Sequence, residues 1–349
     1  MSPDPSALRV LSFGAGAIGT YIGGSLALHG HSVVFLERPE VAASLRDSAL
    51  HLNLNGIEHQ IATPDVAESL EEALSKGPFN VAVFALKSFD TQAALAGIAP
   101  YAQDMPPILC LQNGVENETR IAEALGAGKV IPGTVTSAIG RRAAGNIILE
   151  RLRGVGIAAK HPLSERLANA FTQAGLNARL FSHAPAMKWS KMLTNLLANA
   201  TSAILDMPPG DIFAHPGLYQ LEIAQLREAL AVMGAQGIKV VDLPGTPVRA
   251  LAFGVRYLPL ALSRPLLQKA VGGGRGEKMP SFHIDLHGGR GKSEVDYLNG
   301  AVVRLGEKYG VPTPANRLLN DTLLGLTNGE IPMYTYSHKP EKLIEVFKG

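Results

Sequence analysis

The sequence predicts an α/β protein in which a doubly wound parallel sheet is followed by a second, mostly helical domain. Short apolar runs alternate with helical segments through the first half, which is the pattern of a parallel sheet covered by helices. From Ala186 onward the strong segments have helical spacing instead. The length of 349 residues also exceeds what one hydrophobic core usually organises. We therefore expect two domains, residues 1–185 and 186–349.

The composition limits the class of protein. The chain is 46% hydrophobic and 18% charged, which is typical of a compact, core-rich protein. Its net charge of +2 gives no electrostatic reason to expect nucleic acid or an anionic membrane as a partner. Cys110 is the only cysteine, so an internal disulfide and a cysteine-based metal cluster are excluded. No secretory signal and no membrane-spanning stretch are visible, and we expect a cytoplasmic protein.

The first elements form a βαβ unit. Residues 8–13 are an apolar run that we predict to be a buried strand, residues 20–29 have helical spacing, and residues 32–36 are a second apolar run. Between the first strand and the helix lies the run Gly14-Ala15-Gly16-Ala17-Ile18-Gly19. A G-x-G-x-x-G run in this context is the fingerprint of a Rossmann-type dinucleotide-binding domain.

Each glycine of this run has a physical reason to be there. Gly14 permits the tight turn, Gly16 lets a pyrophosphate approach the backbone because it has no Cβ, and Gly19 allows the helix to pack closely on the strand. The helix N-terminus then faces the anion. The alternative interpretation is a glycine-rich turn in another kind of α/β protein.

The second strand ends at Glu37 and Arg38, which bear on the choice of cofactor. An acidic residue at this position binds the ribose hydroxyls of NAD, whereas a cation accommodates the 2′-phosphate of NADP. Pro39 biases Arg38 to an extended conformation, and the guanidinium fork suits phosphate. We therefore predict NADP (NADPH) as the cofactor, with a solvated surface arginine as the alternative.

The next strands bring two more polar residues toward the same edge. We predict strands at residues 80–86, 108–111, 129–136, 147–149, 155–158 and 178–181. The first of these ends at Lys87, and the second leads to Asn113. Because ligands bind at the carboxyl ends of the strands in such sheets, Lys87 and Asn113 should lie beside the cofactor cleft.

The second half is predicted to be helical at residues 188–205, 218–237 and 293–309. On one continuous helix, Lys191, Asn195 and Asn199 would fall on nearly one line. A cation and two amides on an otherwise apolar helix are costly unless they serve a ligand or satisfy backbone groups at a domain junction. Residues 244–276 are rich in Gly, Pro, Arg and Leu, and they form either an added helical pair or a mobile lid with a hinge at residues 272–274.

These motifs together resemble the ketopantoate reductase (2-dehydropantoate 2-reductase) family over nearly the whole chain. Besides the glycine run, Arg38, Lys87 and Asn113-Gly114, the resemblance rests on three later motifs. They are Lys191-x-x-x-Asn195-x-x-x-Asn199, then Ser281-x-x-x-Asp285, then Glu294-x-Asp296-Tyr297-x-Asn299-Gly300. The family fold is a Rossmann domain followed by a helical domain like that of 6-phosphogluconate dehydrogenase, with the active site between them.

The resemblance implies a role for each matching residue. Lys191 corresponds to the general acid and Glu294 to the acidic residue that supports it. Asn113, Asn195, Asn199 and Ser281 correspond to substrate-binding positions. The implied cofactor contacts are Gly14, Ala15, Gly16, Ala17, Ile18, Gly19, Arg38, Lys87, Asn113, Ala138 and Glu294. The implied reaction is the NADPH-dependent reduction of a 2-oxo acid in pantothenate biosynthesis, and the favoured substrate is 2-dehydropantoate. A protonated lysine stabilises the negative charge that develops on the carbonyl oxygen and supplies the proton.

Two function classes stay open at this stage, the reductase and a non-catalytic NADP(H) sensor that uses the same cleft. Within the enzyme class, another 2-oxo or 2-hydroxy acid is the competing substrate, because Pro209 stands where some members carry a substrate-side asparagine. Glu294 after Ser293 has a second interpretation as a helix-capping carboxylate. The oligomeric state is left open, with a homodimer as the candidate assembly. His283 and His287 share a helix face, but no third ligand suggests itself near them, and we predict no metal site.

Overall fold

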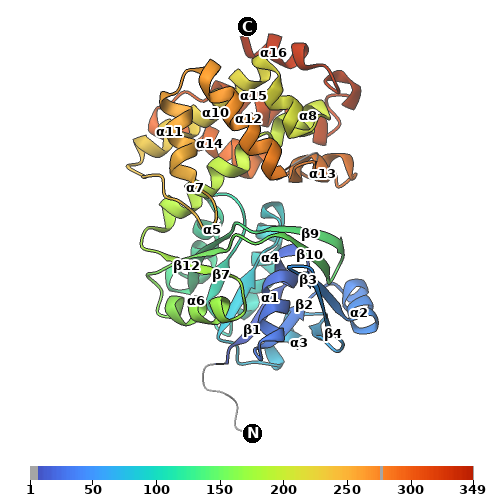
Figure 1. Cartoon of the computed structure of the whole chain (residues 1–349). Coiled ribbons are helices and arrows are strands. Elements are labelled where there is room, and N and C mark those ends of the chain that lie inside the picture. Colours follow the sequence, from blue (N-terminus) through green and yellow to red (C-terminus); the bar gives the residue numbers. More distant parts are fainter. Residues whose placement is uncertain (1–6, 276–277, 349) are drawn as a thin grey trace. The chain divides into compact units, whose positions relative to one another are not determined.

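The computed structural model describes residues 7–275 and 278–348, which form two compact units (Figure 1). The first unit holds the chain up to Lys188 together with Leu243–Thr246, and the second holds the rest. The sequence argument assigned everything after residue 185 to the second domain, so the placement of Leu243–Thr246 is a correction. Its cause is local, because the Thr136 hydroxyl donates to the Pro244 carbonyl oxygen at 2.9 Å.

The first unit is built on an eight-stranded sheet. Its order is β12-β11-β8-β7-β6-β1-β2-β5, and all neighbours are parallel except β8 and β11. The strands are β1 (Arg9–Phe13), β2 (Ser32–Leu36), β5 (Asp65–Ala67), β6 (Val81–Phe84), β7 (Ile108–Cys110), β8 (Val130–Val135), β11 (Val155–Ala158) and β12 (Ala178–Phe181). The chain order reverses between β1 and β6, which is the switch point where doubly wound sheets bind ligands. The Rossmann-type fold predicted from the sequence is confirmed.

A second, four-stranded sheet covers helix α1 (Ala17–Leu28). Its order is β4-β3-β10-β9, with β3 (Leu50–Leu54), β4 (Ile57–Ile61), β9 (Ala138–Ala143) and β10 (Asn146–Arg151). Two glycines let α1 fit between the sheets. A Cβ on Gly23 would lie 2.8 Å from the Phe35 ring in β2, and a Cβ on Gly24 would lie 2.6 Å from Leu52 in β3. Figure 1 shows α1 with β3, β9 and β10 on the near side of the sheet.

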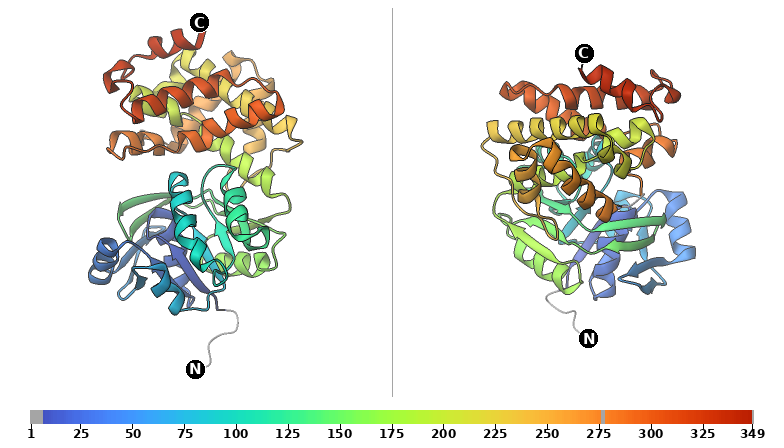
Figure 2. Two further views of the ribbon diagram at one scale, coloured as in Figure 1. Left: turned by 180° about the vertical axis from the view of Figure 1, so that it is seen from behind. Right: turned by 45° about the horizontal axis from the view of Figure 1, so that its top comes forward.

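Helices complete both faces of the large sheet. They are α2 (Pro39–Ser48), α3 (Leu70–Ser75), α4 (Thr91–Ile98), α5 (Asn117–Leu125) and α6 (Ser164–Gln173), with short 3₁₀ turns η1 (Ser88–Asp90), η2 (Ala99–Tyr101) and η3 (Ala127–Lys129). One buried cluster joins α1 and α6 to the sheet, and a second joins α3, α4 and α5 to its other face. The view from behind in Figure 2 shows this second layer.

The second unit is helical. Its elements are α7 (Ala184–Leu196), which begins in the first unit, then α8 (Asn199–Leu205), α9 (Pro209–Ala214), α10 (Pro216–Ala235), α11 (Val248–Tyr257), α12 (Leu260–Arg275), α13 (Ser281–His287), α14 (Val295–Tyr309), α15 (Pro314–Thr327), η4 (Met333–Thr335) and α16 (Pro340–Lys348). The long helix α10 packs against α9, α11, α14, α15 and α16. Within the described residues, no helix has the length and apolar character needed to cross a membrane.

The predicted continuous helix over residues 188–205 is wrong. Helix α7 ends at Leu196, Ala198 adopts a left-handed conformation with φ of 50°, and α8 begins at Asn199. Buried Glu222 of α10 explains the break, because its carboxylate accepts the Ala198 N–H at 2.8 Å. The Asn199 side chain donates to the Asn195 carbonyl oxygen at 3.1 Å, where a continuing helix would use the backbone N–H. Lys191, Asn195 and Asn199 therefore do not lie along one helix.

Buried polar side chains join α10, α14 and α15. The Asn299 amide donates to Gln225 Oε1 at 3.0 Å and to Asn316 Oδ1 at 3.1 Å. Glu228 accepts the backbone N–H groups of Ala315 and Asn316 at the start of α15. Burial raises the pKa of Glu228, and the hydrogen bonds from α15 oppose that shift. Asn299 of the Glu-x-Asp-Tyr-x-Asn-Gly motif thus has a structural role.

The segment at residues 244–276 contains two helices after Thr246. Helix α12 packs on α9, and Tyr219 of α10 donates to the Ser263 hydroxyl at 2.6 Å. Residues 272–274, the hinge of the lid hypothesis, lie in the helical range of α12. Gly276 is outside the described residues. This packing favours the added helical pair over the lid.

Candidate active site

The glycine run forms a turn with open space above its second glycine. Gly14 has φ of 94°, a conformation that favours glycine, and its N–H donates to the Leu36 carbonyl oxygen at 3.0 Å. A Cβ on Gly19 would collide with the Gly14 carbonyl oxygen, whereas a Cβ on Gly16 would meet no atom within 4 Å. Over the described residues, no side chain caps α1 and no acidic residue lies in its first turn. Free N–H groups beside an open glycine fit a pyrophosphate.

Glu37 is bound to this turn, which the sequence did not predict. Its Oε1 accepts the Ala15 N–H at 2.6 Å, and its Oε2 accepts the Arg38 N–H at 3.3 Å. The sequence argument left the relative direction of Glu37 and Arg38 dependent on where the strand ends. Strand β2 ends at Leu36, so both residues follow it. The carboxylate therefore lies at the glycine turn itself.

Arg38 is exposed and stands at the N-cap of α2, with Pro39 as the first residue of the helix. Its backbone is extended, with φ of −65° and ψ of 150°, as expected before a proline. Within the part of the chain that the structure describes, the Arg38 guanidinium has no ion-pair partner. It is available to an anionic group near the glycine turn.

Lys87 and Asn113 follow β6 and β7 at the carboxyl edge, as predicted. The Asn113 carbonyl oxygen accepts the Ser88 hydroxyl at 3.0 Å and the Asn117 side-chain amide at 2.7 Å. Gly114 follows with φ of 94°. These bonds fix the backbone of the loop that carries Asn113. Ala138, the remaining predicted cofactor contact, is the first residue of β9.

A buried ion pair supports the same edge, and the sequence did not reveal it. The Lys188 ammonium lies 2.7 Å from Glu118 Oε1 and donates to the carbonyl oxygens of Gln112, at 2.6 Å, and Gly133, at 3.1 Å. Burial is the largest single influence and would lower the pKa of Lys188, but the charge and hydrogen bond of Glu118, together with the charge of the Cys110 side chain, outweigh it and leave that pKa raised. Nearby Cys110 is buried, and burial raises the pKa of its thiol far above the usual value. This agrees with the expected packing role of that cysteine.

In the second unit, Asn199 and Ser281 come together from α8 and α13. Asn199 is buried, its Oδ1 accepts the Phe282 N–H at 3.0 Å, and its Nδ2 lies 3.4 Å from the Ser281 hydroxyl. The same Nδ2 donates to the Asn195 carbonyl oxygen. The amide of Asn199 thus ties α7 and α8 to the start of α13. Ser281 itself is exposed.

The predicted acid and its support also belong to this unit. Lys191 and Asn195 are half-buried on α7, whereas Glu294 is only 2% exposed at the start of α14. The side chain of Glu294 does not cap α14, and the Val295 N–H donates to the Ser293 hydroxyl instead. This observation weakens the helix-capping interpretation. A buried carboxylate requires polar partners, and Glu294 is not without one in the protein.

Comparison with known proteins adds independent findings. The model of ketopantoate reductase PanE/ApbA matches residues 10–159, and that of its C-terminal part matches residues 185–326. The 2-dehydropantoate 2-reductase of Archaeoglobus fulgidus is 24% identical over 328 residues, covering 92% of this chain and 98% of that protein.

Two solved structures extend the comparison. A PanE/ApbA family ketopantoate reductase from Ralstonia eutropha JMP134 has a TM-score of 0.77 at 27% identity, covering 93% of this chain and 99% of its own. D-mandelate dehydrogenase, solved with NADH and anilino(oxo)acetate, has a TM-score of 0.76 at 21% identity, covering 92% and 99%. At that identity the second likeness shows the fold alone.

Proposed function

The chain belongs to the ketopantoate reductase family, and from that premise we propose that it reduces 2-dehydropantoate to pantoate with NADPH. Family membership makes it an oxidoreductase that acts on a CH–OH group, uses a nicotinamide cofactor and takes a small 2-oxo acid. The choice of NADPH, the identity of the 2-oxo acid and a place in pantothenate biosynthesis belong to the proposal. So do the roles of the individual residues.

Burial of Glu294 is the observation that carries the catalytic part. The residue is 2% exposed, and its side chain does not cap α14, which follows it directly. A buried carboxylate near a lysine holds the ammonium charged and oriented. We assign this function to Glu294 and assign the proton donor to Lys191. Lysine is protonated at neutral pH, so it needs no strong pKa shift to act as an acid.

NADPH, when bound, supplies a hydride to the carbonyl carbon of the substrate. The Lys191 ammonium stabilises the negative charge that develops on the carbonyl oxygen and gives it a proton, which completes the alcohol. Asn195 and Ser281 hold the substrate carboxylate through an amide and a hydroxyl. Asn199 positions Ser281, because its own polar atoms already hold the start of α13.

The fit of the cofactor rests on the first unit. The open space above Gly16 and the free end of α1 suit the pyrophosphate, and exposed Arg38 suits a 2′-phosphate. Glu37 at the turn favours a second candidate, an NADH-dependent reductase of another 2-oxo acid, since a carboxylate at this place binds ribose hydroxyls. Pro209, which begins α9 where some members have a substrate-side asparagine, supports a different substrate pocket.

The test measures oxidation of NADPH and NADH by the purified protein with 2-dehydropantoate and a panel of branched and aromatic 2-oxo acids. Lys191→Ala should lower kcat by about 10²–10⁴, the usual contribution of a positioned acid, while cofactor affinity stays near normal. Glu294→Gln should lower kcat and alter the pH profile. Lys239→Ala, which removes an exposed lysine of the same unit, is the matched control.

Each part of the proposal has its own contrary result. Near-normal kcat in Lys191→Ala would make that lysine structural. Faster turnover of another acid, or of NADH, would select the second candidate. Cofactor binding without turnover of any acid would indicate a nucleotide sensor.

A further inference from the structure

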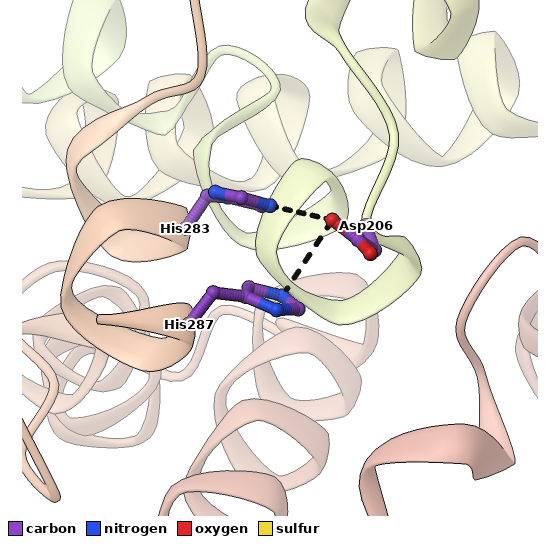
Figure 3. A group of neighbouring side chains, drawn as sticks. All are labelled: Asp206, His283 and His287. Carbon is purple, nitrogen blue, oxygen red and sulfur yellow. Dashed lines mark hydrogen bonds and ion pairs between the residues drawn. The ribbon is translucent and has the colours of Figure 1, made fainter. Parts of the chain in front are cut away.

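Three potential metal ligands converge at the junction of α8 and α13. They are the Asp206 carboxylate and the imidazoles of His283 and His287, whose ligand atoms all lie within 4.8 Å of one another. His283 Nε2 lies 2.7 Å from Asp206 Oδ1, and His287 Nε2 lies 4.0 Å from the same oxygen. Figure 3 shows both rings directed at this carboxylate from successive turns of α13.

The backbone holds the three groups in place. His283 and His287 are four residues apart on α13, so their rings stack, with centroids 4.1 Å apart and an interplanar angle of 19°. Asp206 directly follows α8 as its C-cap residue, in a left-handed conformation with φ of 53°. The three side chains are 14–34% exposed, so the cluster is accessible to an ion from solvent.

We propose that Asp206, His283 and His287 bind a divalent transition-metal ion of the zinc type. Zinc takes imidazole nitrogen and carboxylate oxygen at about 2.0–2.2 Å, so tetrahedral ligands lie about 3.3–3.5 Å from one another. The oxygen–nitrogen distances of 2.7 and 4.0 Å bracket this value. Small side-chain rotations would equalise them around a central ion. Two imidazoles and one carboxylate are also a donor set that favours zinc over magnesium or calcium.

His338 is the candidate fourth ligand. Its Nε2 lies 3.7 Å from Asp206 Oδ2, and its N–H donates to the Leu205 carbonyl oxygen at 2.7 Å, which holds the residue next to the end of α8. Its side chain is 70% exposed and is free to move toward the other three. Otherwise a water molecule completes the coordination.

Binding requires one rearrangement of hydrogen bonds. His287 Nε2 lies 3.1 Å from the Ala203 carbonyl oxygen, and His283 Nε2 lies within hydrogen-bond distance of Asp206. A coordinating Nε2 carries no proton, so both rings take the Nδ1-protonated tautomer when the ion binds. The ion would then connect α8 to α13, the same two helices that Asn199 and Ser281 join at their other ends.

The experiment titrates the chelator-treated full chain with Zn²⁺ by calorimetry and with Co²⁺ by visible absorption. We expect one ion per chain, a tetrahedral cobalt spectrum and a higher Tm with Zn²⁺. Asp206→Asn, His283→Gln and His287→Gln keep polar side chains and should each weaken binding at least about tenfold, since loss of an outer partner alone costs that much. His215→Gln is the control, because His215 faces one carboxylate, Glu341 at 3.1 Å, and the described residues place it in no group of three potential ligands.

Two results would overturn the proposal. One is no saturable binding by the wild-type chain. The other is equal affinity in the wild type and in the three cluster variants, with only the His215→Gln variant or none affected. Thermal unfolding in metal-free buffer shows which variants are folded, and a variant that fails this check is replaced by the next of the three. Activity is not used as a readout, so the result does not depend on the proposed reaction.

Discussion

Replacement of Lys188 by methionine tests directly how much the buried ion pair stabilises the carboxyl edge of the sheet. The Lys188 side chain is 5% exposed, and its ammonium contacts Glu118 and the carbonyl oxygens of Gln112 and Gly133. Methionine keeps the apolar stem and removes the charge. Removing one partner of a buried ion pair costs about 3–5 kcal/mol. Because Glu118 keeps 15% exposure, we expect about 3 kcal/mol.

The assay is urea unfolding followed by circular dichroism, with hydrogen exchange in residues 108–135 to locate the effect. Lys76→Met is the matched control, because Lys76 Nζ lies 2.6 Å from Asp65 Oδ1 at the surface. An exposed pair of this kind contributes about 0–1 kcal/mol. Adding Glu118→Gln to Lys188→Met should recover part of the loss, since no unpaired buried charge then remains.

The pH dependence follows from the raised pKa of Lys188. A group whose pKa is raised on folding contributes stability that is fully present below its unfolded value of 10.5 and is lost only as pH rises through the folded value. The difference between the wild type and Lys188→Met should therefore be constant from about pH 6 to 9. If Lys188→Met costs no more than Lys76→Met, or if the difference vanishes by pH 9, the buried charge does not stabilise this edge.

Two further pairs of variants test the cofactor turn and the packing of α14. Arg38→Ala should weaken NADPH binding by about 1.5–3 kcal/mol and leave NADH binding nearly unchanged, whereas Glu37→Gln should weaken NADH binding more than NADPH binding. Calorimetric titration with both cofactors measures these changes. Equal losses for the two cofactors in either variant would contradict the assignment of that residue to its cofactor. Gly300→Ala should lower the free energy of unfolding by about 1–3 kcal/mol, because the added Cβ would press on Asp296 and lie 2.9 Å from Asn320 Oδ1. Gly234→Ala, whose added Cβ would meet no atom within 4 Å, should raise the free energy of unfolding by up to about 1 kcal/mol. Similar shifts of the two variants in thermal unfolding would refute the packing argument.

The Rossmann-type half could be predicted because its signals are local. The apolar runs of β1 and β2 and the glycines between them lie within thirty residues, and each residue type has a reason that depends only on the turn it occupies. The small sheet was missed in large part because β3, β4 and β9 carry polar residues and pair with distant segments. Strand β3, for example, pairs with β10, about ninety residues later.

The wrong prediction of one continuous helix in the second half has a cause that is distant in the sequence. The spacing of Lys191, Asn195 and Asn199 satisfies every local requirement for one helix, and a carboxylate from α10 decides otherwise. Glu222 lies 24 residues from the Ala198 N–H that it accepts, so no window of sequence around α7 contains the cause. Asp206 lies still farther along the chain from His283, 77 residues away, which is why the third ligand of the histidine pair could not be found near it in the sequence.

The contacts of each side chain in the structure distinguish different roles among residues of the same sequence motif. In the segment that begins at Glu294, the amide of Asn299 donates hydrogen bonds to side chains of α10 and α15. A side chain larger than that of glycine has no room at Gly300. Glu294 differs, since it is buried without capping its own helix. The motif therefore contains at least one residue that holds the scaffold, and the sequence alone does not distinguish such a residue from one proposed to act on the substrate. Because the Asn299 amide bonds to α10 and α15, its loss should change the stability, whereas the proposed support of Lys191 by Glu294 predicts that loss of Glu294 changes the rate.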